Sequence, residues 1–337
     1  MGKIVGFDIG ENSVKMAYYV GKALKKTAMA ELPDAMVSQG RILSMDAMAD
    51  FLRDAAKRNG IPLVNAALAL PSADFYSRTL TVPAMTELQL RYNLPYEFHD
   101  FLTEEKSKYF FDYSVQNYVR DEAGEVKEIE LFACAMLKSQ VEAYRAMFRR
   151  AGFKLKVLTP SESAYGALLA DYMARTGAPD KGRCIVSLGH ASTYLHIFQG
   201  NRFDSRRGVE IGGAELDRLI ADHCGVDIHV AHGYKESDYN GVLESDYARE
   251  LYGRMAAELM RAVNFYNYNN RDRELHELYL CGGGGGVEPM CRTIAETTGL
   301  TILPAKELLP PEDCPAEPWL YLRAASAAYE AFREGSR

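Results

Sequence analysis

The sequence predicts an α/β protein built from two lobes with a cleft between them. The chain has 337 residues, 47% of them hydrophobic, which is more than one small core can hold and suits two lobes. Three apolar strands, within residues 4–15, 184–193 and 278–286, each run into a glycine-containing turn. Turns of this kind offer backbone N–H groups to phosphate, so the three together predict one shared phosphate-binding cleft.

The first lobe is expected over residues 1–165, and it begins with a β-hairpin whose tip is the first glycine turn. Apolar alternation places the two strands of this hairpin at residues 4–10 and 14–20. Helix-spaced apolar residues over 45–58 predict an amphipathic helix, and residues 65–70 then return as a buried strand. These elements form the expected core of the first lobe.

Residues 72–152 look like a small α+β subdomain inserted into the first lobe. A helical stretch begins after Pro83, and we expect Pro95 to break it because proline cannot donate a helical hydrogen bond. An acidic glycine turn separates two long segments that read as a β-hairpin. The predicted elements are a strand at 75–82, hairpin strands at 109–119 and 128–136, and an amphipathic helix at 138–151.

The second lobe is expected over residues 166–318, with a small helical subdomain at about 214–277. A last helix, at residues 319–334, is expected to pack back onto the first lobe. Its central run, residues 320–332, is rich in alanine. Small side chains suit close packing on protein better than insertion into lipid, which takes bulky apolar and basic residues.

Composition excludes several classes of function. The formal net charge is −7 and no arginine-rich segment is present, which argues against nucleic-acid binding. The six cysteines include no C-x-x-C pair, so they indicate free, buried thiols in a reducing compartment. No run reaches the roughly 20 apolar residues of a membrane span, and the N-terminus lacks the apolar core of a signal peptide. We therefore expect a cytoplasmic protein.

Three histidines, His223, His229 and His232, lie near Cys224 in the sequence. Their spacing matches no standard zinc site, and no cysteine pair accompanies them. We therefore expect them to be solvated or to lie at the edge of a core, and not to bind a metal.

The order of the glycine turns resembles the superfamily of actin, Hsp70 and the sugar kinases over nearly the whole chain. The first motif is Asp8-Ile9-Gly10, the second is the hairpin around Gly189, and the third is the glycine run 282–286. The resemblance implies a two-lobed actin-like, ribonuclease H-like ATPase fold that binds ATP and Mg²⁺. Because this superfamily includes kinases, chaperones and filament scaffolds, the fold alone does not give the function.

The early insertion narrows the resemblance to the cell-division protein FtsA and the type IV pilus assembly family PilM. The local sequence is most similar to PilM, in the segments Leu70-Pro71-Ser72, Arg78-Thr79-Leu80, Pro83-Ala84-Met85, Leu94-Pro95-Tyr96 and Pro160-Ser161-Glu162-Ser163-Ala164. This resemblance implies a cytoplasmic ATP-binding scaffold of pilus assembly or of related type II secretion. It also implies that the N-terminal peptide of a PilN-like inner-membrane protein docks between the first lobe and the insertion, so that the membrane is reached only through that partner.

The resemblance places residues of the first turn against the phosphates of ATP. Asp8 is implied to hold Mg²⁺ through water, since a hard cation prefers oxygen ligands; the alternative is a carboxylate that caps the turn. Gly10, Asn12 and Ser13 would donate to the β-phosphate from backbone and side-chain groups. Lys15 resembles a phosphate-binding lysine, although a solvated strand position would explain it equally well.

The second turn departs from the superfamily pattern. Ser187 stands where the pattern has Asp, and it cannot supply the anionic oxygen that organises Mg²⁺ and an attacking water. Glu162 matches a water-positioning residue of relatives, with helix capping as the alternative. We therefore expect ATP binding with weak or no hydrolysis. The other implied nucleotide contacts are Gly189, His190, Ser192, Thr193, Gly212, Gly213, Lys235, Gly282, Gly283, Gly284 and Gly285.

Two other interpretations stay open at this point. An FtsA-like division protein shares the insertion and ATP binding, but it would carry an amphipathic membrane anchor, unlike the alanine-rich helix here. An active ATPase or kinase of the same superfamily would need an acidic base near Ser187, where none is present. Self-association is left open as well. For the scaffold, we expect nucleotide to hold the lobes in the arrangement that binds the peptide.

Overall fold

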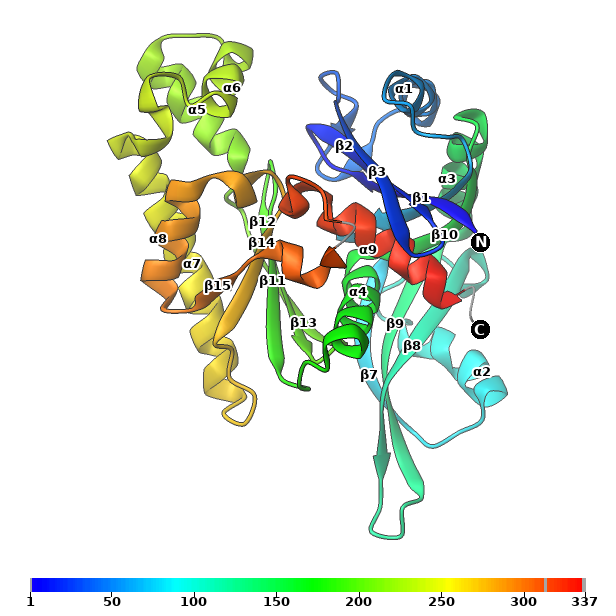
Figure 1. Ribbon diagram of the computed structural model, residues 1–337. Coiled ribbons are helices and arrows are strands. Elements are labelled where there is room, and N and C mark those ends of the chain that lie inside the picture. Colours follow the sequence, from blue (N-terminus) through cyan, green and yellow to red (C-terminus); the bar gives the residue numbers. More distant parts are fainter. Residues whose placement is uncertain (1, 312–313, 335–337) are drawn as a thin grey trace.

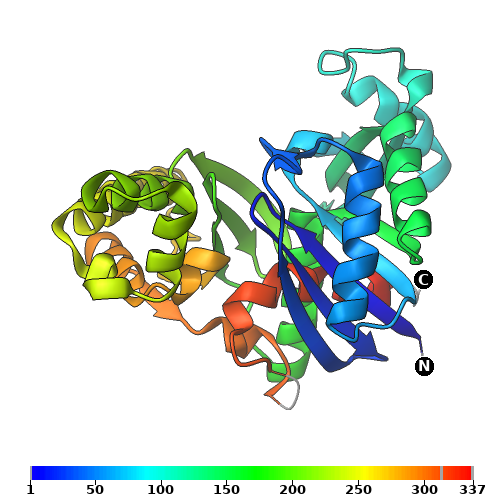
Figure 2. The ribbon, with the colours of Figure 1, turned by 90° about the horizontal axis from the view of Figure 1, so that it is seen from above.

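Two lobes lie side by side in the computed structural model, which describes residues 2–311 and 314–334 (Figures 1 and 2). Each lobe is built on a five-stranded mixed sheet, and the two sheets have matching topology. In both, the first strand of the lobe pairs antiparallel with the next strand on one side and parallel with a later strand on the other. This is the predicted α/β architecture of two related lobes.

The sheet of the first lobe has one face covered by two helices, α1 (Met45–Arg58) and α3 (Lys138–Arg150). Side chains of β1 that point to this face, such as Phe7, are buried among apolar residues of both helices. The strand order is β10-β6-β1-β2-β3, with the bounds Lys154–Pro160 (β10), Asn65–Leu70 (β6), Lys3–Ile9 (β1), Ser13–Val20 (β2) and Ala23–Glu31 (β3). A short ribbon of β4 (Val37–Ser38) and β5 (Arg41–Ile42) follows β3.

The sheet of the second lobe carries a helical subdomain. Its strand order is β13-β12-β11-β14-β15, with the bounds Arg202–Val209 (β13), Thr193–Gln199 (β12), Gly182–Leu188 (β11), Glu277–Cys281 (β14) and Thr301–Leu303 (β15). The helices of this lobe are α5 (Gly213–Cys224), α6 (Ile228–Glu236), α7 (Asp246–Asn269) and α8 (Glu288–Thr298). They share one core with the sheet.

Two helices, α4 (Ser161–Thr176) and α9 (Pro318–Glu334), lie between the two sheets (Figure 1). Their buried residues form a core with apolar side chains from both sheets, including Ala67 of the first and Ile185 of the second. The lobes therefore share a core, and the helix predicted at 319–334 lies within it.

The packing of α9 on β1 depends on a glycine. A β-carbon at Gly6, in the middle of β1, would overlap the backbone carbonyl of Ala324 in α9. The buried alanines of α9, among them Ala324, Ala325 and Ala328, keep the helix axis close to the sheet. The alanine-rich composition of this helix thus serves close packing on the first lobe.

The inserted subdomain has a three-stranded sheet and a core of its own. The strand order is β7-β9-β8, with the bounds Tyr76–Pro83 (β7), Val126–Leu137 (β9) and Tyr109–Arg120 (β8). The helix α2 (Glu87–Glu97) packs on this sheet through Leu90 and Leu94. Our expectation that Pro95 breaks this helix was wrong. Pro95 lies in the last turn, where it removes one hydrogen bond while the buried leucines and a capping box at Thr86 hold the helix.

Two further expectations concern the state of the cysteines and a membrane-spanning helix. All six cysteines are free; Cys184 and Cys281 are buried as predicted, whereas Cys224 is exposed at the end of α5. Among the described residues, no helix combines the length and the apolar character that a membrane span needs.

Candidate functional site

The first glycine turn joins β1 to β2 and brings a lysine to its backbone. The N–H of Gly10 donates to the carbonyl of Ser13 (3.0 Å), which closes the turn. Asp8 and Lys15 face each other across the hairpin register, and the ammonium group of Lys15 lies 3.8 Å from where a β-carbon of Gly10 would be. Burial lowers the pKa of Lys15, and Asp8 opposes this effect. The turn therefore holds a cation beside its glycine.

The second glycine turn packs against the start of α5. The N–H of Gly213 donates to the carbonyl of Gly189 (3.0 Å), and Ala214 donates to His190 in the same way (2.8 Å). The ammonium group of Lys235, from α6, lies 3.5 Å from where a β-carbon of Gly213 would be. The structure therefore brings Gly189, His190, Gly212, Gly213 and Lys235 together, and their predicted contact with nucleotide stays a prediction.

The hydroxyl residues of the second turn are placed differently from each other. Thr193 is fully buried and its hydroxyl donates to the carbonyl of Ile211 (2.9 Å). The hydroxyl proton of Thr193 is therefore used in a hydrogen bond inside the lobe. Ser192 is partly exposed, and its carbonyl accepts from Gly189 (3.1 Å). Of the two, Ser192 is the one whose side chain is open to a ligand.

A hydrogen bond between the lobes links the first glycine turn to α6. The amide nitrogen of Asn12 lies 3.2 Å from Nε2 of His232 on α6, and Nδ1 of His232 lies 3.1 Å from Asp217 on α5. Lys235 pairs with the other oxygen of Asp217 (2.8 Å). His232 was expected to be a solvated or core-edge residue, and its side chain is partly exposed. It also joins the first-lobe turn to the buried carboxylate of the second lobe.

This link predicts a pH-dependent stability. The hydrogen bond to Asp217 raises the pKa of His232 above its usual value of 6.5, although burial opposes the rise. Because the folded pKa exceeds the unfolded one, the stabilisation is fully present below about pH 6.5 and is lost as the pH rises through the folded pKa. We expect His232→Gln to lower the free energy of unfolding more at about pH 5 than at about pH 8, as measured by urea denaturation.

His99→Gln is the matched control, since His99 is exposed in the inserted subdomain. It should change stability little at either pH. An equal loss for His232→Gln at both pH values, or a larger loss at the higher one, would contradict the described contact with Asp217.

The surroundings of Asp8 do not fit the predicted Mg²⁺ site. A guanidinium nitrogen of Arg323, from α9, donates to Asp8, and the two form an ion pair. Burial by itself would lower the pKa of Arg323, but the neighbouring Asp8 raises the pKa of Arg323 above its usual value. The matching strand of the second lobe offers Ser187 and no carboxylate. Within residues 2–311 and 314–334, no group of three or more His, Cys, Asp or Glu side chains is placed to hold a metal ion.

Glu162 is enclosed by protein at the start of α4. Only 2% of the residue is exposed, and its Oε1 accepts a hydrogen bond from Arg206 of β13 (2.7 Å). Burial raises the pKa of Glu162, although Arg206 favours its ionised form. The neighbouring His196 has its pKa lowered to about 3 by burial, so it is neutral near pH 7. This setting suits a structural ion pair better than a carboxylate that positions water in an open cleft.

The glycine run after β14 is explained largely by packing. Gly282 has a positive φ of 86°, and a β-carbon at Gly284 would lie 2.8 Å from the side chain of Leu188. Gly285 and Gly286 lie against the ring of Trp319 at the start of α9. Of the five glycines at 282–286, only Gly283 has no neighbouring atom within 4 Å of where a β-carbon would be. Three of the four glycines that the resemblance assigns to nucleotide, Gly282, Gly284 and Gly285, are therefore explained by packing.

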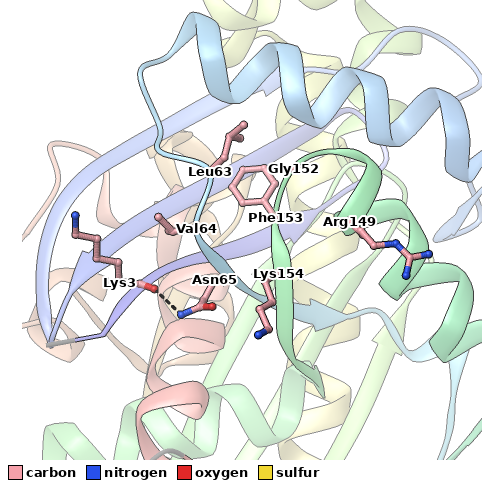
Figure 3. A pocket seen from close by; sticks show the side chains of 8 residues that line it. All are labelled: Lys3, Leu63, Val64, Asn65, Arg149, Gly152, Phe153 and Lys154. Atoms are coloured by element: carbon pink, nitrogen blue, oxygen red, sulfur yellow. Dashed lines mark hydrogen bonds between the residues drawn. The ribbon is translucent and has the colours of Figure 1, made fainter.

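A surface hollow of about 450 Å³ lies elsewhere on the first lobe (Figure 3). It is found at the start of β1, β6 and β10, whereas the first glycine turn follows the opposite end of β1. The hollow is therefore separate from the first glycine turn. Its lining residues are Lys3, Leu63, Val64, Asn65, Arg149, Gly152, Phe153 and Lys154.

The two matching sheets and the helices between them define a two-lobed protein of the actin-like fold class. Within that class, residues 6–307 match the family of the type IV pilus assembly protein PilM, and the chain belongs to this family. The predicted membership is thereby confirmed. No curated protein matches the sequence of this chain.

Solved structures show how widely the fold is shared. A PilM-PilN type IV pilus biogenesis complex has 19% identity and a TM-score of 0.80, with 98% of each chain covered. The ethanolamine utilization protein EutJ from Carboxydothermus hydrogenoformans has 13% identity and a TM-score of 0.60, with 98% of this chain and 90% of that chain covered. MreB 5 of Spiroplasma citri, bound to AMPPNP, has 12% identity and a TM-score of 0.54, with 100% and 98% covered. At these identities, they establish the fold.

Proposed function

We propose that this chain is a cytoplasmic, ATP-binding scaffold of type IV pilus assembly or of a related type II secretion system. It docks the N-terminal peptide of a PilN-like inner-membrane protein and hydrolyses ATP weakly or not at all. The observation that carries the proposal is the family match over residues 6–307, which includes the whole inserted subdomain. The solved PilM-PilN complex, which aligns with the chain over 98% of its length, supports the choice of partner.

Nucleotide binding is supported by the chemistry of the two turns. Lys15 and Lys235 each place an ammonium group within 4 Å of the position of a β-carbon added at a turn glycine, Gly10 in the first lobe and Gly213 in the second. The backbone N–H groups of these two glycines already donate to the carbonyls of Ser13 and Gly189, so side chains would form the anion site. Lys15 and Ser13 would hold phosphate from the first lobe, and Lys235 and Ser192 would hold it from the second. ATP would thereby link the lobes.

Weak hydrolysis is supported by the residues at the two positions where a carboxylate would be needed to activate the attacking water. Ser187 offers a hydroxyl in place of a carboxylate, and Glu162 is buried in an ion pair with Arg206. A general base must reach the water that it activates. Neither residue fits that role, so the bound nucleotide would act by holding the lobes together.

Peptide docking is supported by the surface of the inserted subdomain. Of the exposed large apolar side chains in the described residues, the ones in this subdomain are Leu88, Tyr92, Tyr96, Phe101, Phe110, Val115 and Tyr118. Phe110 lies near the start of β8, an edge strand, and the ammonium group of Lys138 at the start of α3 is 5.4 Å from its ring centre. This is the junction between the insertion and the first lobe. An extended peptide can pair with such an edge and place side chains in neighbouring pockets.

A contact between the insertion and the second lobe gives nucleotide a route to the peptide site. The backbone N–H of Phe203 in β13 donates to the side-chain oxygen of Gln116 in β8 (2.9 Å). The ring of Phe203 also packs edge-on against Phe132 in β9, with ring centres 4.9 Å apart. A change in the angle between the lobes would therefore move or strain the insertion. Through this contact, ATP would favour the arrangement that binds the peptide.

The test is a titration of the full chain with a fluorescent N-terminal peptide of the PilN-like protein encoded in the same genome. We expect Phe110→Ala to weaken peptide binding about tenfold, because a buried aromatic anchor contributes on the order of 1.4 kcal/mol or more. Binding is followed by fluorescence anisotropy with and without saturating ATP, and phosphate release is measured in parallel.

Phe265→Ala is the matched control, since Phe265 is an exposed phenylalanine of the second lobe. It should leave peptide affinity unchanged. Equal affinity of both variants and the wild type would rule out the proposed junction, and no binding of any PilN-like peptide would rule out the partner. Peptide affinity that is unchanged by ATP would rule out the coupling, and rapid phosphate release would favour an active ATPase.

A further inference from the structure

We infer that Arg323 takes the place of the divalent cation in this cleft, so that the chain binds nucleotide without Mg²⁺. The inference concerns the ion pair between Arg323 and Asp8, at the end of β1. It rests on the proposed nucleotide binding, and it reverses the role that the sequence predicted for Asp8. The proposed ligand is the nucleoside triphosphate without a bound metal ion.

The first step is that Asp8 already has a cationic partner. Its carboxylate accepts from the guanidinium of Arg323, and only 7% of Asp8 is exposed. A divalent cation held by Asp8 through water would need these same oxygens and room for its water shell. It would also lie next to the fixed positive charge of Arg323, and such repulsion is strong where water is scarce.

The second step is that Arg323 is not free to leave. It lies on α9, whose backbone packs on β1 at Gly6 and whose neighbouring residues Leu322, Ala324 and Ala325 are buried in the core shared by the two lobes. Burial of a guanidinium is tolerated only when a carboxylate pairs with it. Separating Arg323 from Asp8 would leave the buried carboxylate and the largely enclosed guanidinium without their ion-pair partners.

The third step is that the cleft has cations for the phosphates without a metal. Lys15 in the first lobe and Lys235 in the second lie at the two glycine turns. Arg323 is paired with Asp8, and Lys235 is paired with Asp217 (2.8 Å), so both cations are held in place. Ser187 removes the second carboxylate that would otherwise help to organise a hydrated metal. The phosphates would therefore contact the ammonium groups of Lys15 and Lys235 directly, without a metal between them.

The experiment compares ATP affinity of the full chain in excess EDTA and in excess Mg²⁺, by isothermal titration calorimetry. We expect the two dissociation constants to agree within about threefold. Weakening by tenfold or more in EDTA would overturn the inference. In Arg323→Met, affinity in EDTA should fall at least tenfold, and Mg²⁺ should restore it, because Asp8 is then available. Arg323→Lys keeps a cation and should behave like the wild type.

A second measurement needs no nucleotide and covers the case in which Arg323→Met does not fold. Binding of Mn²⁺ to the nucleotide-free protein is followed by the electron paramagnetic resonance of the free ion, in the wild type and in Asp8→Asn. The wild type and Asp8→Asn should bind the same amount of Mn²⁺. A site that is present in the wild type and lost in Asp8→Asn would overturn the inference. Absence of ATP binding in both EDTA and Mg²⁺ would instead contradict the proposed nucleotide binding, and the Mn²⁺ result would still decide the role of Arg323.

Discussion

Replacing Gly6 by alanine is expected to lower the free energy of unfolding by about 3 kcal/mol or more. The added β-carbon would overlap the backbone carbonyl of Ala324 and crowd the backbone N–H of Ala328. No side chain can rotate away from this overlap, so α9 would have to move off β1. That movement would open the core shared by both lobes and separate Arg323 from Asp8.

The measurement is urea denaturation of both proteins, and Gly253→Ala is the matched control. Gly253 lies inside α7 with nothing within 4 Å of where the added methyl group would be, so alanine there should add roughly 0.5–1 kcal/mol through helix propensity. The same change is thus expected to have opposite signs at the two sites. A loss below about 1 kcal/mol for Gly6→Ala would mean that α9 does not lie on β1 as described.

Much of the fold could be predicted because its elements have a clear local pattern. The first hairpin, the helix Met45–Arg58 and the strand Asn65–Leu70 follow from alternating or helix-spaced apolar residues. The helix that contains Pro95 was misjudged because local propensity was given more weight than packing. Buried Leu90 and Leu94 hold this helix onto the sheet of the insertion, and no local rule reports such a contact.

The candidate site was predictable where its residues lie on the turns themselves. Gly10, Lys15, Gly189 and Gly213 could be proposed because turns with glycine have a recognisable pattern, and the structure places a lysine beside a glycine in each lobe. The glycine run was overinterpreted, since its contacts with Leu188 and Trp319 come from elsewhere in the chain. A glycine that makes room for a ligand and one that makes room for a side chain look alike in sequence.

Two residues of the site were missed because their partners lie far away in the chain. Asn12 meets His232 across 220 positions, and Asp8 meets Arg323 across 315. A signal was nevertheless present for each. Arg323 is a lone charge in a run of apolar and small residues, where only a buried ion pair could accommodate it. His232 lies three positions before Lys235 on a predicted helix, so both face the same side.

Replacing Arg206 by methionine is expected to lower the free energy of unfolding by about 3 kcal/mol at neutral pH, because it leaves Glu162 buried without its cation. Arg207→Met is the control, since the next residue of β13 points to the other face and is exposed. It should change stability by less than about 1 kcal/mol. Urea denaturation of the two variants measures the difference.

The pH dependence and a double variant separate a buried charge from lost packing. Burial raises the pKa of Glu162 above its usual value of 4.5 in the folded protein, so folding favours the neutral carboxyl. This contribution to stability is fully present below the pKa of the unfolded chain, and it is lost as the pH rises through the folded pKa. The cost of Arg206→Met should therefore shrink at acid pH, and Glu162→Gln in the same chain should recover most of it at neutral pH. If packing alone were lost, neither change would help. If Glu162→Gln by itself also leaves phosphate release unchanged, Glu162 holds α4 to the second lobe and takes no part in hydrolysis.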